Sequence, residues 1–220
     1  MKDMIPEFAK RMIIEIALRM LNHLPQSPRI KKIHRSFYIQ KFLRTDIPVA
    51  NVEIARDAGV KVGKNCRFYD VKFGIEPFLI EIGDNVLISG NVQFINHDGG
   101  INIFRFEQEH IVGHYGKIKI GNNCFIGFGS IILPNVQIGN NCIICAGSVV
   151  ASSFPDDCVI MGNPAKVIFK TSVYKKMKLA SPYTVYDEEI WFPESDMLPQ
   201  SVRKEKILKA IDKLPIRKPR

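Results

Sequence analysis

The chain has 220 residues, of which 46% are hydrophobic and 24% are charged, a composition typical of a soluble globular domain with a sizeable core. No apolar run reaches the roughly 18 residues of a membrane-spanning helix, and the first residues lack the pattern of a signal peptide, so we expect a cytoplasmic protein. Five cysteines, an odd number, argue against a disulfide framework.

The net charge of +9 is concentrated at the two ends of the chain. Residues 1–44 sum to +7 and residues 201–220 to +6, which leaves −4 for residues 45–200. A basic end is most simply a solvated surface, but it can also attract the inner face of a membrane, a lipid-linked phosphate or a phosphorylated cofactor. We expect no nucleic-acid partner, because the basic segments lack interleaved aromatic residues and a known binding motif.

A helix is predicted over residues 7–24, within an N-terminal helical extension of residues 1–50. Its apolar side chains recur at helical spacing on one face; they are Phe8, Met12, Ile16, Met20, Leu21 and Leu24. The pattern favours a helix that packs against a neighbouring surface, and a helix that lies on a membrane is the alternative.

A six-residue repeat dominates the middle of the chain. Branched aliphatic residues recur at Ile120, Ile126, Ile132, Ile138, Ile144 and Val150. The pentapeptide IGNNC at residues 120–124 returns unchanged at residues 138–142, and related segments stand upstream at residues 62–68 and 82–88. The sequence therefore has two periods, of six and of eighteen residues.

A period of six fits neither an α-helix nor an ordinary strand meander. It fits a coil in which each hexad supplies a short strand and a corner, and three hexads complete one turn. We therefore predict a mainly β fold over residues 51–170, a parallel β-helix whose repeated aliphatic residues point inward. Three of them are followed by a glycine, which is expected to allow corner conformations that a side chain would oppose: Gly121, Gly127 and Gly139.

An insertion interrupts the repeat between Ile82 and Ile120. The 38 residues from one to the other equal one turn plus about twenty residues. Two turns with a two-residue bulge would give the same count, but the polar, glycine-containing run lacks the hexad pattern and favours a loop over residues 97–117. Long loops within compact domains are usually functional.

A C-terminal extension follows the coil at residues 171–220. Residues 171–200 are predicted to be irregular. Ser201 precedes a basic periodic segment and predicts a capped helix there.

Residues 55–170 resemble the hexapeptide-repeat acyltransferases, in the branch of the maltose, galactoside and serine acetyltransferases and of many acetyltransferases of surface-polysaccharide synthesis. The resemblance rests on IGDNVLISGNVQFINHDGG and on the hexads from Lys117 to Ile168. The HDGG form and the upstream FGIEPFLIEIGDNV are typical of the polysaccharide branch. The resemblance implies a left-handed coil, a homotrimer with active sites between its subunits, and direct transfer of acetyl from acetyl-CoA to an acceptor hydroxyl.

His97 matches the catalytic histidine of this family. A sugar hydroxyl is a poor nucleophile at neutral pH, and an imidazole can take its proton and return one to the leaving thiolate. Backbone N–H groups near the coil edge would stabilise the oxyanion. His110 and His114 lie in the same loop and are rival candidates, although an exposed loop side chain is the simpler interpretation of each.

Three neighbours are candidate acceptor-binding residues: Asn96, Asp98 and Arg105. Asn96 precedes the histidine at the start of the loop. Asp98 could orient the imidazole or bind sugar hydroxyls, but an aspartate before Gly-Gly is equally typical of a turn. Arg105, with Glu107 and Glu109, could contact the acceptor, whereas loop charges usually face water.

The resemblance also implies a set of acetyl-CoA contacts. Phe125 stands where sugar acetyltransferases often have a tryptophan near the thioester, and Lys166 matches a basic residue that faces the phosphates of the cofactor. Ser152 stands where relatives often have lysine, which leaves more of the phosphate contact to Lys166. The expected pantetheine segment comprises Gly127, Phe128, Ala146 and Gly147.

We expect no metal site. Residues 142–145 form a single CxxC without a second pair, which is a weak zinc signal. The repeat explains Cys142 as the stacking partner of Cys124, and turns about 4.8 Å apart exceed the roughly 3.8 Å Cβ separation of a relaxed disulfide. These two residues are predicted to be packed thiols.

The sequence thus predicts an acetyl-CoA-dependent O-acetyltransferase that acts on a saccharide in surface-polysaccharide biosynthesis. Three alternatives stay open: an N-acetyltransferase on an amino sugar, a zinc-dependent lyase of the carbonic-anhydrase type that would use His97, His110 and His114, and a non-catalytic trimeric scaffold. A contact of the basic ends with the inner face of a membrane is compatible with the predicted O-acetyltransferase.

Overall fold

The computed structural model describes residues 47–107, 113–184, 200–211 and 214. The chain divides into two compact units, one of residues 51–184 and one of residues 1–50 and 185–220. The helix predicted at residues 7–24 lies outside the described residues. The repeats all fall within the unit of residues 51–184.

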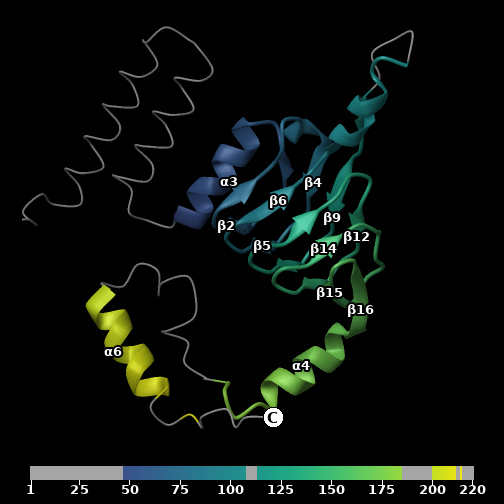
Figure 1. The fold of residues 1–220 in the computed structure, drawn as a ribbon. Coiled ribbons are helices and arrows are strands. Elements are labelled where there is room, and N and C mark those ends of the chain that lie inside the picture. Colours follow the sequence, from purple (N-terminus) through teal and green to yellow (C-terminus); the bar gives the residue numbers. More distant parts are fainter. Residues whose placement is uncertain (1–46, 108–112, 185–199, 212–213, 215–220) are drawn as a thin grey trace, which may run out of the picture. The chain divides into compact units, whose positions relative to one another are not determined.

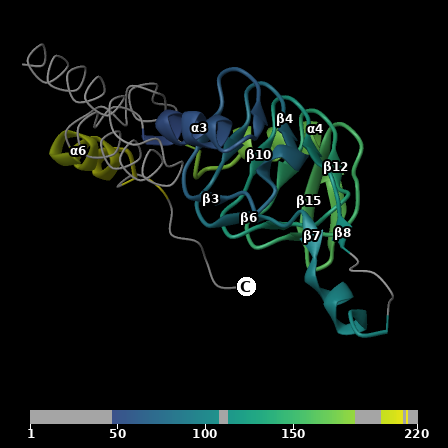
Figure 2. The same ribbon diagram turned by 90° about the horizontal axis from the view of Figure 1, so that it is seen from above.

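Three sheets form the walls of a coil, which can be followed in Figures 1 and 2. Sheet A consists of β1 (Lys61–Val62), β4 (Ile80–Ile82), β9 (Ile118–Ile120) and β12 (Gln137–Ile138). Sheet B consists of β2 (Arg67–Phe68), β5 (Leu87–Ile88), β10 (Phe125–Ile126), β13 (Ile143–Ile144), β15 (Cys158–Gly162) and β16 (Ala165–Lys170). Sheet C consists of β3 (Val71–Lys72), β6 (Val92–Phe94), β11 (Ile131–Ile132) and β14 (Val149–Val150).

Neighbouring strands within these walls are parallel, except for the antiparallel pair β15 and β16. The chain visits sheets A, B and C in turn and then returns to sheet A one level on. This is the architecture of a parallel β-helix, and it confirms the predicted fold class.

The repeated aliphatic residues fill the inside of the coil, as predicted. Ile82 pairs with Ile120 and Ile120 with Ile138, so equivalent hexad positions stack from turn to turn. The largest fully buried side chains are Phe68, Phe94, Ile80, Ile82, Ile88, Ile118, Ile120, Ile126, Ile132, Ile138, Ile144 and Ile160. Burial of one such side chain stabilises a fold by roughly 1.5–3 kcal/mol. Because the same inward position recurs in every turn, the sequence needs an apolar residue there at a regular spacing.

The glycine of the IGNNC motif serves close packing between turns. A Cβ atom on Gly121 would lie 2.6 Å from the carbonyl carbon of Gly139, one turn away. Neither glycine has a positive φ. The expectation that this glycine supplies an unusual corner conformation is therefore wrong, and the left-handed conformation belongs to the second asparagine of the motif.

A ladder of amide side chains runs along this corner of the coil. Its members all have φ between 54° and 62°, and they are Asn65, Asn85, Asn123, Asn141 and Asp157. Each asparagine Nδ2 donates to the side-chain oxygen of the next member at 3.0–3.2 Å. Asparagine tolerates this backbone region better than other residues with a side chain. A carboxylate only accepts hydrogen bonds, so Asp157 is a suitable last member.

The cysteines of the coil are free thiols. Cys124 Sγ donates to the Gly139 carbonyl and Cys142 Sγ to the Pro155 carbonyl, both at 3.2 Å. Burial raises the pKa of the Cys66 and Cys158 thiols. The prediction that Cys124 and Cys142 are packed thiols is confirmed.

Helix α3 (Ile47–Asp57) covers the first turn of the coil. Val52 and Ala55 are buried in the core. Asn51 Nδ2 donates to the Phe68 carbonyl at 2.9 Å, and Arg56 Nε donates to the Val62 carbonyl at 3.2 Å. The boundary expected at residue 51 coincides with the division between the two units, and α3 runs across it.

Helix α4 (Thr171–Leu179) follows β16 directly. The prediction that residues 171–200 are irregular is wrong for this part. The Tyr174 ring stacks on Phe169 of β16, with centroids 6.4 Å apart, and Lys176 and Lys178 occupy the last turn, where cations interact favourably with the helix dipole. Contact with the last strand thus stabilises a helix that its sequence alone does not indicate.

Helix α6 (Gln200–Ile211) lies in the other compact unit. It confirms the predicted basic helix, but Ser201 lies inside the helix and is therefore not its N-cap. In the part of the chain that the structure describes, no helix has the length and apolar character needed to cross a bilayer.

Candidate active site

An arm leaves the coil between β6 of sheet C and β9 of sheet A (Figure 1). Its base is an antiparallel pair, β7 (His97–Asp98) with β8 (His114–Tyr115), and the 3₁₀ segment η2 (Gly99–Phe104) follows β7. The pairing of Ile82 with Ile120 across the insertion excludes the alternative of two turns with a bulge. The described parts of the predicted loop, residues 97–107 and 113–117, lie between β6 and β9 and outside the strands of the coil walls.

His97 stands at the base of the arm and contacts a carboxylate. Its Nδ1 lies 2.9 Å from Oε2 of Glu76, and the two side chains are 34% and 18% exposed. An ionised carboxylate only accepts hydrogen bonds, so the neutral imidazole carries its proton on Nδ1. The lone pair of Nε2 is then free to take a proton from another molecule.

Sequence reasoning missed Glu76, which belongs to the coil turn before the arm. It lies 21 residues ahead of His97, immediately before η1 (Pro77–Leu79). Both residues occupy the corner between sheets C and A on successive turns. The available signal was an isolated acid in the apolar run FGIEPFLI, but an altered corner length hides its register with the histidine.

Asn96 does not face an acceptor, contrary to the prediction. Its side chain is completely buried, and Nδ2 donates to the carbonyls of Glu76 at 2.6 Å and Phe73 at 3.3 Å. A short polar side chain beside an exposed loop resembles a ligand contact in sequence. In the structure the Asn96 side chain bonds the backbone of the preceding coil turn, at Phe73 and Glu76.

Asp98 adopts the turn role that was the alternative interpretation. Its Oδ1 accepts a hydrogen bond from the Gly100 N–H at 2.8 Å and caps η2. Glu76, not Asp98, orients the imidazole of His97. The carboxylate of Asp98 is exposed and sits beside the base of the arm.

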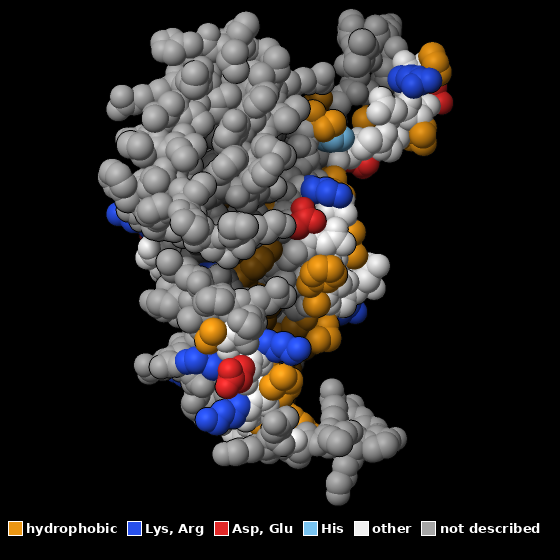
Figure 3. Space-filling model, turned by 90° about the vertical axis from the view of Figure 1, so that its left-hand side faces the viewer, with side chains coloured by type: hydrophobic (Ala, Val, Ile, Leu, Met, Phe, Trp, Pro, Cys, Tyr) orange, Lys and Arg blue, Asp and Glu red, His pale blue; other side chains and the backbone are white. Residues whose placement is uncertain are grey.

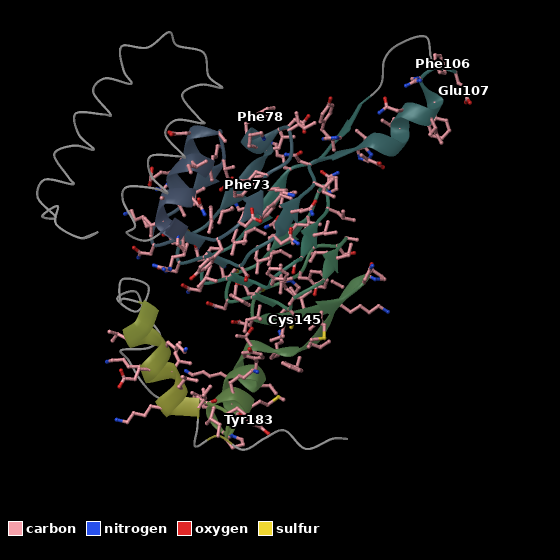
Figure 4. The ribbon with its side chains drawn as sticks, turned by 60° about the vertical axis from the view of Figure 1, so that its left-hand side comes forward. Phe73, Phe78, Phe106, Glu107, Cys145 and Tyr183 are labelled. Carbon is pink, nitrogen blue, oxygen red and sulfur yellow. The ribbon has the colours of Figure 1, made fainter. Side chains whose placement is uncertain are left out.

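The remaining polar candidates of the arm do not gather around His97. Arg105 ends η2, with its guanidinium 4.6 Å from the ring centroid of Phe106. Figure 4 shows Phe106 and Glu107 at the outer end of the arm, away from the coil. His114 is exposed on β8 in register with Asp98, and His110 lies outside the described residues.

An aromatic side chain of the arm adjoins the histidine. The rings of Tyr115 and His97 are 6.3 Å apart at 57°, and Tyr115 is 57% exposed. Figure 3 shows a histidine (pale blue) reaching the surface beside hydrophobic side chains where the arm leaves the coil. The base of the arm is therefore accessible to a substrate.

Most of the expected acetyl-CoA contacts lie along the corner between sheets B and C. Phe128 is exposed at this corner, and the Gly147 N–H donates to the Phe128 carbonyl at 2.8 Å. Phe125 is exposed on β10, the strand of sheet B that leads into this corner. Ala146 and Gly147 present open backbone, with φ of 71° at Gly147. A Cβ on Gly127 would lie 2.5 Å from Ala146 N, so Gly127 is required by packing between turns.

The two residues expected at the phosphates are exposed but separated. Lys166 lies on β16, the last strand of sheet B. Ser152 follows β14 and so lies at the corner between sheets C and A. Only Lys166 continues along the sheet that carries Phe125.

Among the described residues, no group of three or more His, Cys, Asp or Glu side chains could hold a metal ion.

Comparison with known proteins connects this geometry to a family. Residues 117–152 match the family model described as bacterial transferase hexapeptide (six repeats). Protein CapG of Staphylococcus aureus is 54% identical over 123 residues, which cover 54% of this chain and 71% of CapG. The chain belongs to the hexapeptide-repeat acetyltransferase family. It is therefore an enzyme built on the left-handed parallel β-helix.

Further relatives are more distant. YvoF of Bacillus subtilis (strain 168), which is named as an acetyltransferase, is 28% identical over 164 residues covering 71% of this chain and 88% of that protein. The solved structure of a galactoside acetyltransferase in complex with coenzyme A is 22% identical, covers 84% of this chain and 93% of that one, and has a TM-score of 0.47.

Proposed function

We propose that this acetyltransferase uses acetyl-CoA to acetylate a hydroxyl group of a saccharide. The observation that carries the proposal is the pair of His97 and Glu76, a base oriented by a carboxylate at an exposed corner of the coil. An imidazole in this arrangement can activate a hydroxyl near neutral pH. An amino sugar, acetylated on nitrogen, is the alternative acceptor, because the same base would serve an ammonium-derived amine.

The reaction needs only one proton relay. Nε2 of His97 takes the hydroxyl proton while the oxygen attacks the thioester carbonyl, and the same nitrogen returns that proton to the departing thiolate. Glu76 stabilises the imidazolium formed in between, because its carboxylate accepts the Nδ1 hydrogen bond. Backbone N–H groups at the coil edge would stabilise the charge on the carbonyl oxygen. No covalent acyl-enzyme is required.

The corner between sheets B and C fits the acetyl-CoA co-substrate. Phe128 at this corner and Phe125 on the adjoining strand β10 are exposed and offer apolar contact to the thioester end. The exposed backbone at Ala146, together with the Gly147 carbonyl, offers hydrogen-bonding groups to a pantetheine arm. Lys166 would face the phosphates, with Ser152 as a weaker contact. The acceptor would then approach from the side of the arm, where Asp98 and Arg105 are candidate contacts.

We further propose a homotrimer with its active sites between subunits, acting in surface-polysaccharide biosynthesis at the cytoplasmic side of the membrane. The family resemblance of residues 55–170 supports the trimer, and the HDGG and FGIEPFLIEIGDNV segments support the polysaccharide branch. The basic ends support contact with an anionic membrane surface, since residues 1–44 carry a net charge of +7.

Release of free thiol from acetyl-CoA, followed with candidate saccharides and with mass spectrometry of the product, tests this function. We expect thiol release to depend on the acceptor and the product mass to increase by one acetyl group. An unchanged melting temperature when acetyl-CoA is titrated would contradict the proposal, because a ligand that binds the folded state raises its stability.

Replacement of Lys166 by glutamine is expected to raise the KM for acetyl-CoA by about tenfold, because a hydrogen bond to a charged phosphate is lost. Initial rates at varied acetyl-CoA measure the effect. The matched control is Lys72→Gln, which removes an exposed lysine of sheet C and should leave the KM unchanged. Equal KM values for Lys166→Gln and the wild type would remove Lys166 from the site.

A further inference from the structure

The segment that carries Glu76 is held at three points. The Phe73 ring packs between Phe68 and Phe94, with centroids 5.8 and 5.4 Å away. Asn96 Nδ2 then donates to the carbonyls of Phe73 and Glu76. The backbone from residue 73 to residue 76 is thereby fixed, while the Ile75 side chain between these points is 78% exposed.

The amide of Asn96 has one defined orientation. Two carbonyls face Nδ2, so exchanging its nitrogen and oxygen would place three acceptors together. Asn96 Oδ1 is buried without a hydrogen-bond partner, and an unsatisfied buried acceptor is costly. The unpaired Oδ1 destabilises the fold, whereas Nδ2 bonds the segment that carries Glu76. We therefore infer that Asn96, immediately before the proposed base, does more than fill space.

Gly74 makes this arrangement possible. It has a φ of +68°, and a Cβ at this position would lie 2.5 Å from Asn96 Oδ1. Glycine adopts this backbone region without penalty. Any side chain here would displace either the amide of Asn96 or the segment that it holds.

Asn96 is also tied to the histidine side of the site. It is the chain neighbour of His97, and its own carbonyl accepts a hydrogen bond from the Gly116 N–H at 2.8 Å, where the arm returns to the coil. The preceding Ile95 N–H donates to the Ile132 carbonyl at 2.8 Å. One residue therefore connects the backbone that carries His97 with the backbone that carries Glu76.

We propose that Asn96 and Gly74 are positioning residues, which set the Glu76 carboxylate against Nδ1 of His97 without touching the substrate. The inference rests on the proposed function for the role of His97 as the base. Its structural part, control of the Glu76–His97 hydrogen bond, stands apart from the identity of the acceptor. Disturbing either residue should therefore reproduce the loss of Glu76 itself.

The test compares Gly74→Ala, Asn96→Ala and Glu76→Gln in the full chain, with histidine ring nitrogens labelled by ¹⁵N. The chain has five histidines, and a His97→Gln variant identifies the His97 signals. We expect the wild type to hold its neutral proton on Nδ1 and all three variants to lose that preference. Turnover should fall by about tenfold to a hundredfold, with the KM for acetyl-CoA unchanged.

Ile75→Ala is the matched control, because it truncates an exposed side chain of the same segment; it should keep the ring signals and turnover of the wild type. Thermal unfolding checks that the variants fold, and Gly74→Ala keeps the test open if Asn96→Ala does not. Reduced turnover with an intact Nδ1–H signal in the folded variants would overturn the positioning role. Altered ring signals with full activity, in Glu76→Gln as well, would instead contradict the proposed function of His97.

Discussion

Replacement of His97 by alanine should lower turnover by a factor on the order of 10² to 10⁴, because a general base and the acid that protonates the thiolate are lost together. The imidazole is partly exposed and contributes no core packing, being 34% accessible. The oligomeric state should therefore match that of the wild type, and stability should fall by only about 1 kcal/mol, because the hydrogen bond to Glu76 is lost. Steady-state rates at saturating acetyl-CoA and acceptor measure the loss.

His114→Ala is the appropriate comparison for this prediction. His114 belongs to the same arm and is exposed on β8, opposite Asp98, yet it does not share the hydrogen bond to Glu76. We expect its removal to change turnover by less than about threefold, since surface substitutions away from a site have small effects. Equal rates for His97→Ala and the wild type would remove His97 as the base.

The coil was predictable from sequence because its physics repeats. Ile120, Ile126 and Ile132 each occupy one wall, and each meets the same environment one turn later. A strict spacing of buried positions therefore appears directly in the chain. The identical pentapeptides at residues 120–124 and 138–142 even report their stacking, since Ile120 pairs with Ile138.

The interaction that completes the site was not predictable in the same way. Glu76 and His97 are both in corners whose lengths depart from the repeat, so their spacing of 21 residues differs from the period of eighteen. Corner residues are selected for local turns and for chemistry, and neither leaves a periodic signal. The hydrogen bond between Glu76 and His97 forms only when sheets C and A, which flank this corner, are aligned from turn to turn.

Asn96 and Asp98 show a second limit. Both are short polar residues next to the proposed base, and sequence gives no information about which backbone groups they meet. The Asn96 amide donates to two carbonyls of the previous turn, while the Asp98 carboxylate accepts a hydrogen bond from the N–H of Gly100 within its own turn. Polar side chains with nearby backbone partners are often structural, so proximity to a histidine in sequence was a weak basis for a substrate contact.

Helix α4 is an element that sequence analysis failed to predict. Residues 171–200 were predicted to be irregular, and the α4 segment does contain β-branched and aromatic residues, which weaken a helix in isolation. The contact of Tyr174 with Phe169 and the hydrogen bond from Thr171 Oγ1 to the Asn141 carbonyl at 2.7 Å tie it to the last turns of the coil. Tertiary contacts decided the outcome.

Gly121→Ala should destabilise the coil by about 3 kcal/mol, the upper part of the range for overpacking a tight interior. The added Cβ would lie 2.6 Å from the backbone carbon and oxygen of Gly139 and 2.8 Å from Asn140 N. Those atoms cannot move freely, because Asn140 N also donates to Asp156 Oδ1 at 2.8 Å and Asn141 belongs to the amide ladder. A shift would therefore spread to the next turn.

Denaturant midpoints at a fixed protein concentration measure this loss, with Gly99→Ala as the control. A Cβ on Gly99 would meet nothing within 4 Å. The free energy of unfolding of Gly99→Ala should therefore stay within about 0.5 kcal/mol of the wild-type value. Both changes add one methyl group to a glycine without a positive φ, but only the methyl group at Gly121 would meet the backbone of an adjacent turn. Equal stabilities would mean that the turns can separate to admit a side chain, and close approach would no longer account for the glycine of the IGNNC repeat.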